Sequence, residues 1–148
     1  MTRVFLFGAW LGIVLVASAT EAEKMRTIAK GNFSGIQEAK QLVVTNAAQW
    51  TEVWQKHSVG KSPGEKAPEA DFEKETVIFV ALGQQRTGGY GIEIAEVKRV
   101  EGKVKVLVKT RKPKPGGIQL QAISAPFHAV AVPKFSGEAI FKQESAER

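Results

Sequence analysis

The sequence contains no cysteine, two histidines and a single aspartate, Asp71, among its 148 residues. Without cysteine, a disulfide scaffold, a thiol nucleophile, a thiolate zinc site and an iron–sulfur cluster are all excluded. With so few histidines and aspartates, the usual metal sites and serine triads have little material from which to be built. We therefore expect no metal, no cofactor and no catalytic residues. The weaker alternative to a non-catalytic protein is an uncharacterised hydrolase.

Long hydrophobic runs are also scarce, and the longest lies at the start of the chain. Residues 4–16 carry no charge, follow Arg3 and precede the small-residue site Ala17-Ser18-Ala19. This run is shorter than the ~20 apolar residues that span a membrane. A charged start, an apolar run and an A-x-A site are typical of a secretory signal peptide. We expect residues 1–19 to be removed, which gives a periplasmic or secreted protein without a stable membrane anchor.

One later segment has the pattern of an amphipathic helix. Four residues share one helical face by their spacing: Trp50, Val53, Trp54 and His57. Asn46 is a favourable N-cap, and Gln49 follows it at the spacing of a capping box. We expect the helix to begin after Asn46 and to end at Val59-Gly60.

Most other apolar residues fall in short runs or alternate with polar ones, as in β strands. The strands that we expect are residues 27–30, 41–44, 76–82, 90–95, 103–111, 118–123, 127–132 and 139–141. Glu101-Gly102 forms a hairpin turn, and a slip in the apolar phase predicts a bulge at Ala95 or Glu96. The fold class is α+β, with a mostly antiparallel sheet of six to eight strands and one packed helix. A chain of 148 residues, 43% of them apolar, holds one domain, here residues 20–148 with an ordered core of about 26–143.

The most distinctive segment, residues 84–89, connects two of the expected strands. Its last two glycines permit backbone angles that a side chain would hinder. One interpretation is a plain hairpin connection, and the other is a partner-binding loop formed by Arg86, Thr87, Gly88, Gly89 and Tyr90. Tyr90 has the strand parity of Ile92 and Ile94, so we expect a buried ring and a hydrogen-bonded hydroxyl.

Positive residues lie on one face of the expected strand at residues 103–111, which is the second strand of the hairpin. They are Lys103, Lys105, Lys109 and Arg111, and Lys112 and Lys114 follow in the next loop. The pattern favours a solvated strand face, and the alternative is a surface that binds anionic components of the cell envelope. No aromatic residues are interleaved with these charges, so we do not expect nucleic acid as a partner.

Both histidines lie among apolar residues. His57 shares a helical face with Trp50 and Trp54, and His128 has the strand parity of Val130 and Val132. Because no H-x-x-x-H spacing or G-x-S-x-G motif accompanies them, we expect hydrogen-bonded packing residues.

Several short motifs occur in an order that resembles the PrcB family of protease-complex subunits, through its C-terminal domain. They are residues 79–83, residues 87–90 (T-G-G-Y), residues 92–94, residues 113–116 and residues 125–128. The upstream pieces, residues 34–36 and 50–57, are also similar to what precedes that domain, so the resemblance covers roughly residues 33–134.

The resemblance implies an exported, non-catalytic accessory protein. Such a protein would bind another exported protein, for example a protease, and would assist its assembly, maturation or stability. The resemblance implies no catalytic residues and no particular oligomeric state. The family's namesake type is a lipoprotein, whereas this sequence has no cysteine to carry such an anchor.

The exported protein should begin at Thr20, because the A-x-A site directly precedes this residue. Intact-mass measurement of the protein from the exported fraction checks this prediction. A membrane-bound species that retains residues 1–19 would contradict it.

Overall fold

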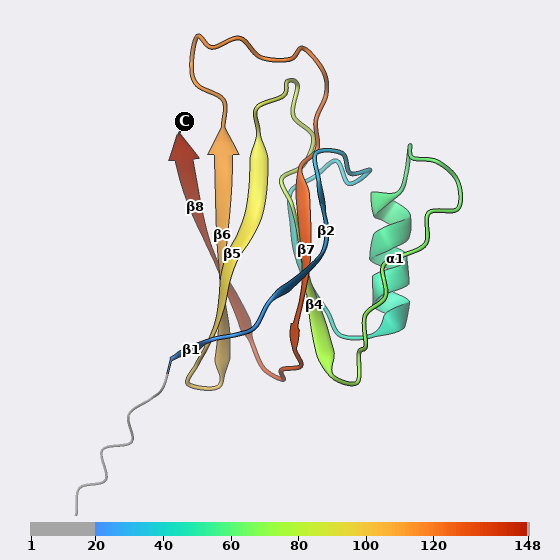
Figure 1. Cartoon of the computed structure of the whole chain (residues 1–148), viewed down its shortest axis with the longest axis vertical. Helices are drawn as coiled ribbons and strands as arrows, with labels where there is room; N and C mark the ends of the chain where they lie inside the picture. Colours follow the sequence, from blue (N-terminus) through green and yellow to red (C-terminus); the bar gives the residue numbers. More distant parts are fainter. Residues whose placement is uncertain (1–19, 148) are drawn as a thin grey trace, which may run out of the picture.

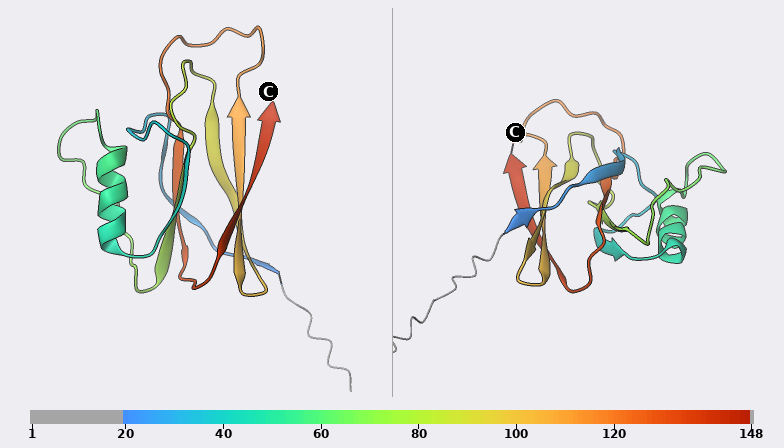
Figure 2. Two further views of the ribbon diagram at one scale, coloured as in Figure 1. Left: turned by 180° about the vertical axis from the view of Figure 1, so that it is seen from behind. Right: turned by 60° about the horizontal axis from the view of Figure 1, so that its bottom comes forward.

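The computed structural model describes residues 20–147, so the predicted signal peptide, residues 1–19, lies outside the described residues. The described chain forms two four-stranded sheets and one helix (Figure 1). Sheet A contains β1 (Glu21–Ala22), β5 (Gly91–Val100), β6 (Lys103–Lys112) and β8 (Ala139–Glu147), in that order. Sheet B contains β2 (Arg26–Gly31), β7 (Phe127–Pro133), β4 (Glu75–Ala81) and β3 (Lys40–Val44), in that order. The helix α1 (Ala47–His57) lies against the face of sheet B that points away from sheet A (Figure 2).

The expected α+β class is confirmed, but the strands divide between two packed sheets instead of forming one. All paired strands are antiparallel except β6 and β8, which are parallel. β8 is longer than the expected strand at residues 139–141, and the short β1 adds to the edge of sheet A.

The two central strands of sheet B are buried on both faces. Toward sheet A, Ile78 of β4 and Val130 of β7 pack with residues such as Val106 of β6. Toward α1, Phe79 of β4 packs with Trp50. The uninterrupted apolar run of residues 76–82 predicted such a doubly buried strand, and its β4 part is buried throughout.

The ends of α1 follow from its capping residues. Asn46 Oδ1 accepts a hydrogen bond from the Gln49 N–H at 2.9 Å, and Gln49 Oε1 accepts one from the Thr45 N–H at 3.0 Å. The predicted cap and the predicted buried face of Trp50, Trp54 and His57 are confirmed. The helix ends at His57 with Ser58 as its C-cap, slightly before the expected Val59-Gly60.

The β5–β6 hairpin has the predicted turn and bulge. Glu101 and Gly102 have φ values of 48° and 76°, in the left-handed region that tight hairpin turns require. The register of the pair shifts between Ile94 and Glu96, which places the bulge at the expected position.

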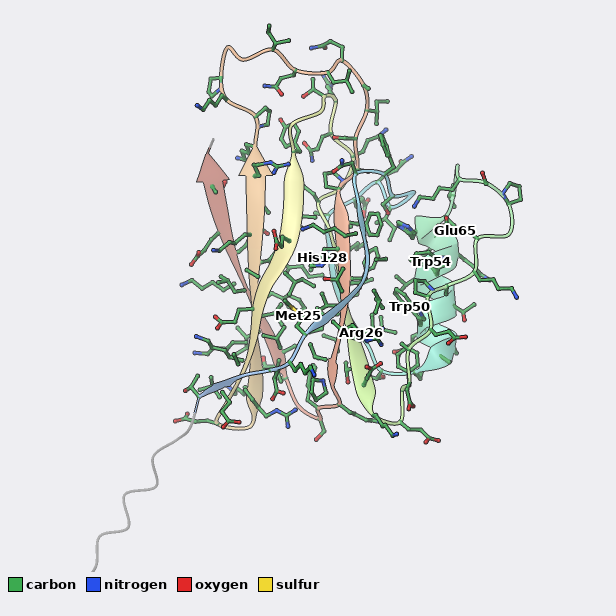
Figure 3. The ribbon with its side chains drawn as sticks, in the orientation of Figure 1. Met25, Arg26, Trp50, Trp54, Glu65 and His128 are labelled. Carbon is green, nitrogen blue, oxygen red and sulfur yellow. The ribbon has the colours of Figure 1, made fainter. Side chains whose placement is uncertain are left out.

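A buried histidine links the two sheets next to this bulge. His128 of β7, labelled in Figure 3, accepts a hydrogen bond at Nδ1 from the Ile94 N–H of β5 at 2.9 Å. Because Nδ1 is an acceptor, the neutral ring carries its proton on Nε2, which donates to Thr27 Oγ1 of β2 at 2.9 Å. One imidazole therefore joins β5 of sheet A to β7 and β2 of sheet B.

The expected strand at residues 118–123 is wrong. After β6 ends, Pro113 and Pro115 lead the chain away from sheet A, and the segment becomes a loop. It contacts the neighbouring loop through the Gly88 N–H to Leu120 O hydrogen bond, and the isolated Gln85–Ser124 bridge follows directly after it. Alternating apolar residues predict a strand only where a sheet is available to bury them.

Within residues 20–147, none of the helices has the length and apolar character needed to cross a bilayer.

Replacing Trp54 by Ala should lower the free energy of unfolding by ~3–5 kcal/mol, because its ring is buried between α1 and sheet B. The matched control is Gln55→Ala, on the exposed side of the same helix, which should change it by no more than ~0.5 kcal/mol. Urea unfolding measures both values. A loss below about 1 kcal/mol for Trp54→Ala would show that the helix face is not part of the core.

Candidate functional site

Two loops pair with each other at the end of the sandwich where β2 and β6 finish (Figure 1). Gln85 and Ser124 exchange backbone hydrogen bonds of 2.7 and 3.0 Å, and the Gly88 N–H donates to Leu120 O at 2.9 Å. Ser124 Oγ also donates to Thr87 O at 2.7 Å. The predicted partner-binding loop is therefore held in place by the loop that follows β6.

Each residue of the predicted loop has a definite position. Arg86 and Gly89 are exposed, whereas Thr87 and Gly88 are half-buried. Gly89 has a φ of 89°, and a Cβ there would collide with Gln119 Oε1 and lie 2.9 Å from Pro113 Cβ. Gly89 therefore permits the close contact of the two loops, as the sequence suggested for this glycine pair.

Tyr90 does not have the expected environment. It is half-buried, and its hydroxyl makes no hydrogen bond to a described residue. β5 begins only at Gly91, so Tyr90 lies just outside the strand and is not buried between the two sheets as Ile92 is.

Large apolar side chains are exposed at this end of the molecule. They belong to the loops after β2, α1 and β6, and their exposed fractions are 63% for Phe33, 68% for Val59, 104% for Ile118, 74% for Leu120 and 59% for Ile123. Phe33, Val59 and Ile123 together line a shallow pocket of about 280 Å³. We call these five residues the apolar loop patch. Apolar clusters of this kind are typical of sites that bind another protein.

The basic strand face is confirmed as a solvent-facing surface, but it also carries acidic residues. Lys103, Lys105 and Lys109 are exposed and Arg111 is half-buried, and Lys112 and Lys114 continue as exposed residues. Lys109 lies between Glu93 of β5 and Glu144 of β8 in the strand register, and Lys103 forms an ion pair with Glu138 at 3.7 Å. The alternation of signs lowers the net positive field of this face.

His57 has a serine neighbour, yet the hydrogen bonds do not activate that serine. His57 Nε2 accepts a hydrogen bond from Lys61 Nζ at 2.7 Å. The ring proton is therefore on Nδ1 and is donated to Ser34 Oγ at 3.0 Å. A general base would instead accept the serine proton. His57 is thus a buried hydrogen-bonding residue among the rings of Trp54, Phe79 and Phe127.

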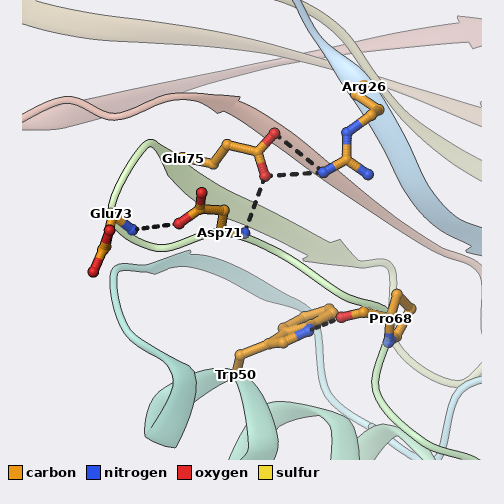
Figure 4. Close-up of polar contacts among 6 residues, drawn as sticks. All are labelled: Arg26, Trp50, Pro68, Asp71, Glu73 and Glu75. Atoms are coloured by element: carbon orange, nitrogen blue, oxygen red, sulfur yellow. Dashed lines mark hydrogen bonds and ion pairs between the residues drawn. The ribbon is translucent and has the colours of Figure 1, made fainter.

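The single aspartate organises a turn (Figure 4). Asp71 Oδ1 accepts a hydrogen bond from the Glu73 N–H, and Glu75 accepts bonds from the Asp71 N–H and from the Arg26 guanidinium. Among residues 20–147, no group of three His, Cys, Asp or Glu side chains is arranged to hold a metal ion.

One comparison with known proteins gives a match. Residues 76–133 match a family model described as PrcB C-terminal, which confirms the suspected PrcB resemblance for this segment. The segment runs from β4 to β7 and contains both paired loops, whereas residues 33–75, included in the expected resemblance, lie outside the match. No curated protein and no solved structure is similar enough to the chain to be matched.

The stability of the fold should depend on pH through the two histidines. Burial lowers the pKa of His57 to about 4, and the charge of Lys61 acts in the same direction. Burial also lowers the pKa of His128 to about 4, aided by Lys30 and opposed by Glu93. Because an unfolded histidine has a pKa of about 6.5, the native state binds fewer protons between these values. The stabilisation is complete above about pH 6.5 and is lost as the pH falls toward 4, by up to roughly 3 kcal/mol per histidine.

Urea unfolding at pH 7.5, 5.5 and 4.5 tests this dependence. In His128→Asn, the amide oxygen can still accept a hydrogen bond from the Ile94 N–H. The loss in the free energy of unfolding that is linked to histidine protonation should fall by about half, because only His57 remains. Equal losses in the parent and the variant would contradict the assignment to His128.

Proposed function

We propose that this protein is an exported, non-catalytic accessory protein that binds another exported protein through the apolar loop patch. The partner is a protease or a protein that assembles with one, and binding assists the assembly, maturation or stability of that complex. The exposure of five large apolar side chains on neighbouring loops is the observation that carries the proposal.

The patch has the composition of an interface centre. Its apolar side chains are available for burial, and Arg86 and Thr87 lie in the loop that pairs with residues 119–124. Interfaces commonly combine an apolar centre with a polar rim in which arginine is frequent. The hydrogen bonds between the two loops also reduce the conformational entropy that would be lost on binding.

The family match supports an accessory role. Residues 76–133 match the PrcB C-terminal model, and the resemblance to PrcB proteins implies an accessory role in a protease complex. The matched segment includes the two paired loops and three of the five patch residues, Ile118, Leu120 and Ile123.

The rival function is the binding of anionic envelope components by the basic strand face. Lys105, Lys109 and Arg111 have no ion pair within the described part of the chain, which favours the rival. Glu93, Glu96 and Glu144 on the neighbouring strands interrupt this positive surface. Because each forms an ion pair with a lysine, they weaken the positive field only in part.

The double change Ile118→Ser, Leu120→Ser should reduce partner capture about tenfold or more, because it removes the two most exposed apolar side chains of the patch. Both side chains are exposed, so the melting temperature should stay nearly unchanged. The measurement is quantitative mass spectrometry of proteins cross-linked to the tagged, exported protein in its native host.

The matched control replaces Lys103, Lys105, Lys109 and Arg111 by Gln, which should leave both capture and folding intact. Capture should also persist when salt is raised from 0.1 to 0.5 M, since an apolar interface is weakly screened. If the Gln variant and high salt abolish binding while the Ser variant does not, the protein binds anionic components instead.

A further inference from the structure

A second surface, a groove beside the edge of sheet B, is distinct in composition from the apolar loop patch. On one side lie β2 and the residues that follow it, and on the other lie the end of α1 and the loop at residues 60–68. The groove has a volume of about 670 Å³, and Ile28, Ala29 and Phe127 contribute apolar surface to it. Phe33 is the only residue that it shares with the apolar loop patch.

The loop wall of the groove is fixed in place by two tryptophans. Trp54 Nε1 donates a hydrogen bond to Glu65 O at 3.2 Å, and Trp50 Nε1 donates one to Pro68 O at 2.8 Å (Figures 3 and 4). Both indoles come from the buried face of α1, so the wall is anchored to the core of the protein. A groove held in this way is preformed, which lowers the entropic cost of filling it.

The opposite wall is an edge strand. Within residues 20–147, β2 pairs only with β7, so the other side of its backbone has no strand partner. An edge strand presents unpaired N–H and C=O groups, to which an extended peptide can add as a further strand. The six residues of β2 give such a peptide a length of backbone to pair with.

A lysine ammonium lies in the groove without an anionic partner. Lys61 Nζ donates to His57 Nε2 at 2.7 Å and lies 5.1 Å from the centre of the Phe127 ring. Among the described residues, no carboxylate lies within ion-pair distance of this ammonium. An ammonium has three donors, so two remain for a ligand. Lys66 adds a positive charge to the groove, Glu65 adds a negative one, and Lys30 is paired with Glu93.

We propose that this groove binds an extended peptide segment, which pairs with the edge of β2 and places an acidic side chain on Lys61. The unpaired ammonium selects a carboxylate, and the partly desolvated aromatic surroundings strengthen that contact. The strand edge selects a peptide over a fatty acid, because an alkyl chain cannot use the backbone donors and acceptors of β2. This site goes beyond the partner-docking role of the apolar loop patch and does not depend on it.

The experiment is an NMR titration of the ¹⁵N-labelled protein with acetyl-Thr-Val-Glu-Val-Thr-Val-amide and with its Gln counterpart. The acidic peptide should shift the amide signals of residues 28–33 and the indole N–H signal of Trp54. It should bind about tenfold more tightly than the Gln peptide, as a charge-assisted hydrogen bond provides. Octanoate, which has a carboxylate and an alkyl chain, should bind more weakly than the acidic peptide.

Three variants assign the contact to Lys61. Lys61→Gln keeps a donor for His57 Nε2 and should remove the preference for the acidic peptide, whereas Lys61→Arg should keep it. Lys56→Gln makes the same charge change at an exposed residue of α1 that is paired with Glu52 and lies outside the groove, and it should have no effect. Melting temperatures confirm that the variants are folded.

Several outcomes would overturn the proposal. Absence of binding by both peptides at millimolar concentration would show that the groove is not a peptide site. Equal binding of the two peptides, or an unchanged preference in Lys61→Gln, would remove the role of Lys61. Binding of octanoate as tight as that of the acidic peptide would indicate an amphiphile site. None of these outcomes affects the apolar loop patch, whose residues Ile118 and Leu120 lie outside the groove.

Discussion

The burial of β4 and β7 on both faces is the constraint on which the rest of the structure depends. These strands carry apolar side chains on both parities, so each face of sheet B needs a cover. Sheet A covers one face and α1 covers the other, which gives three layers. The free energy from burying these side chains holds the layers together, and the helix amphipathicity and the alternating patterns of β5 and β6 follow from the same requirement.

The layers also determine where the candidate surfaces lie. At one end of the sandwich, the loops after β2, α1 and β6 carry large apolar side chains that stay exposed, and three of these side chains line one pocket. Along the edge of sheet B, the groove that contains Lys61 lies between β2 and the end of α1 with the loop that follows it. His128 stabilises the region between these features by joining β2, β7 and β5. The two surfaces meet at Phe33, which lines both the groove and the pocket of the apolar loop patch.

The features that depend on local sequence could be predicted. The Asn46 cap, the Trp50–Trp54 face, the Glu101-Gly102 turn and the bulge after Ile94 each follow from residues close together in the chain. The features that depend on distant partners could not. Nothing near residues 139–147 indicates that β8 pairs in parallel with β6, and residues 118–123 have strand-like alternation without a sheet to join.

The same distinction applies to the candidate sites. The loop at residues 86–90 could be identified from its glycines, but its pairing with residues 120–124 depends on the fold. The acidic residues beside the basic strand come from β5 and β8 and are paired with lysines, so the charges that surround the strand could not be predicted from its own sequence. Lys61 and His57 are close together in the chain, but the position of Lys61 over the Phe127 ring becomes visible only in the folded structure.

Site-specific photo-crosslinking in the native host tests the central claim, partner binding by the apolar loop patch, most directly. A photoreactive phenylalanine analogue would replace Leu120 in one protein and Lys105, on the basic strand face, in another. Both positions are exposed, so each probe can be accommodated without disturbing the core. The account predicts a discrete adduct with one exported protein from position 120 and none from position 105. Adducts from position 105 alone, or from neither position, would contradict it.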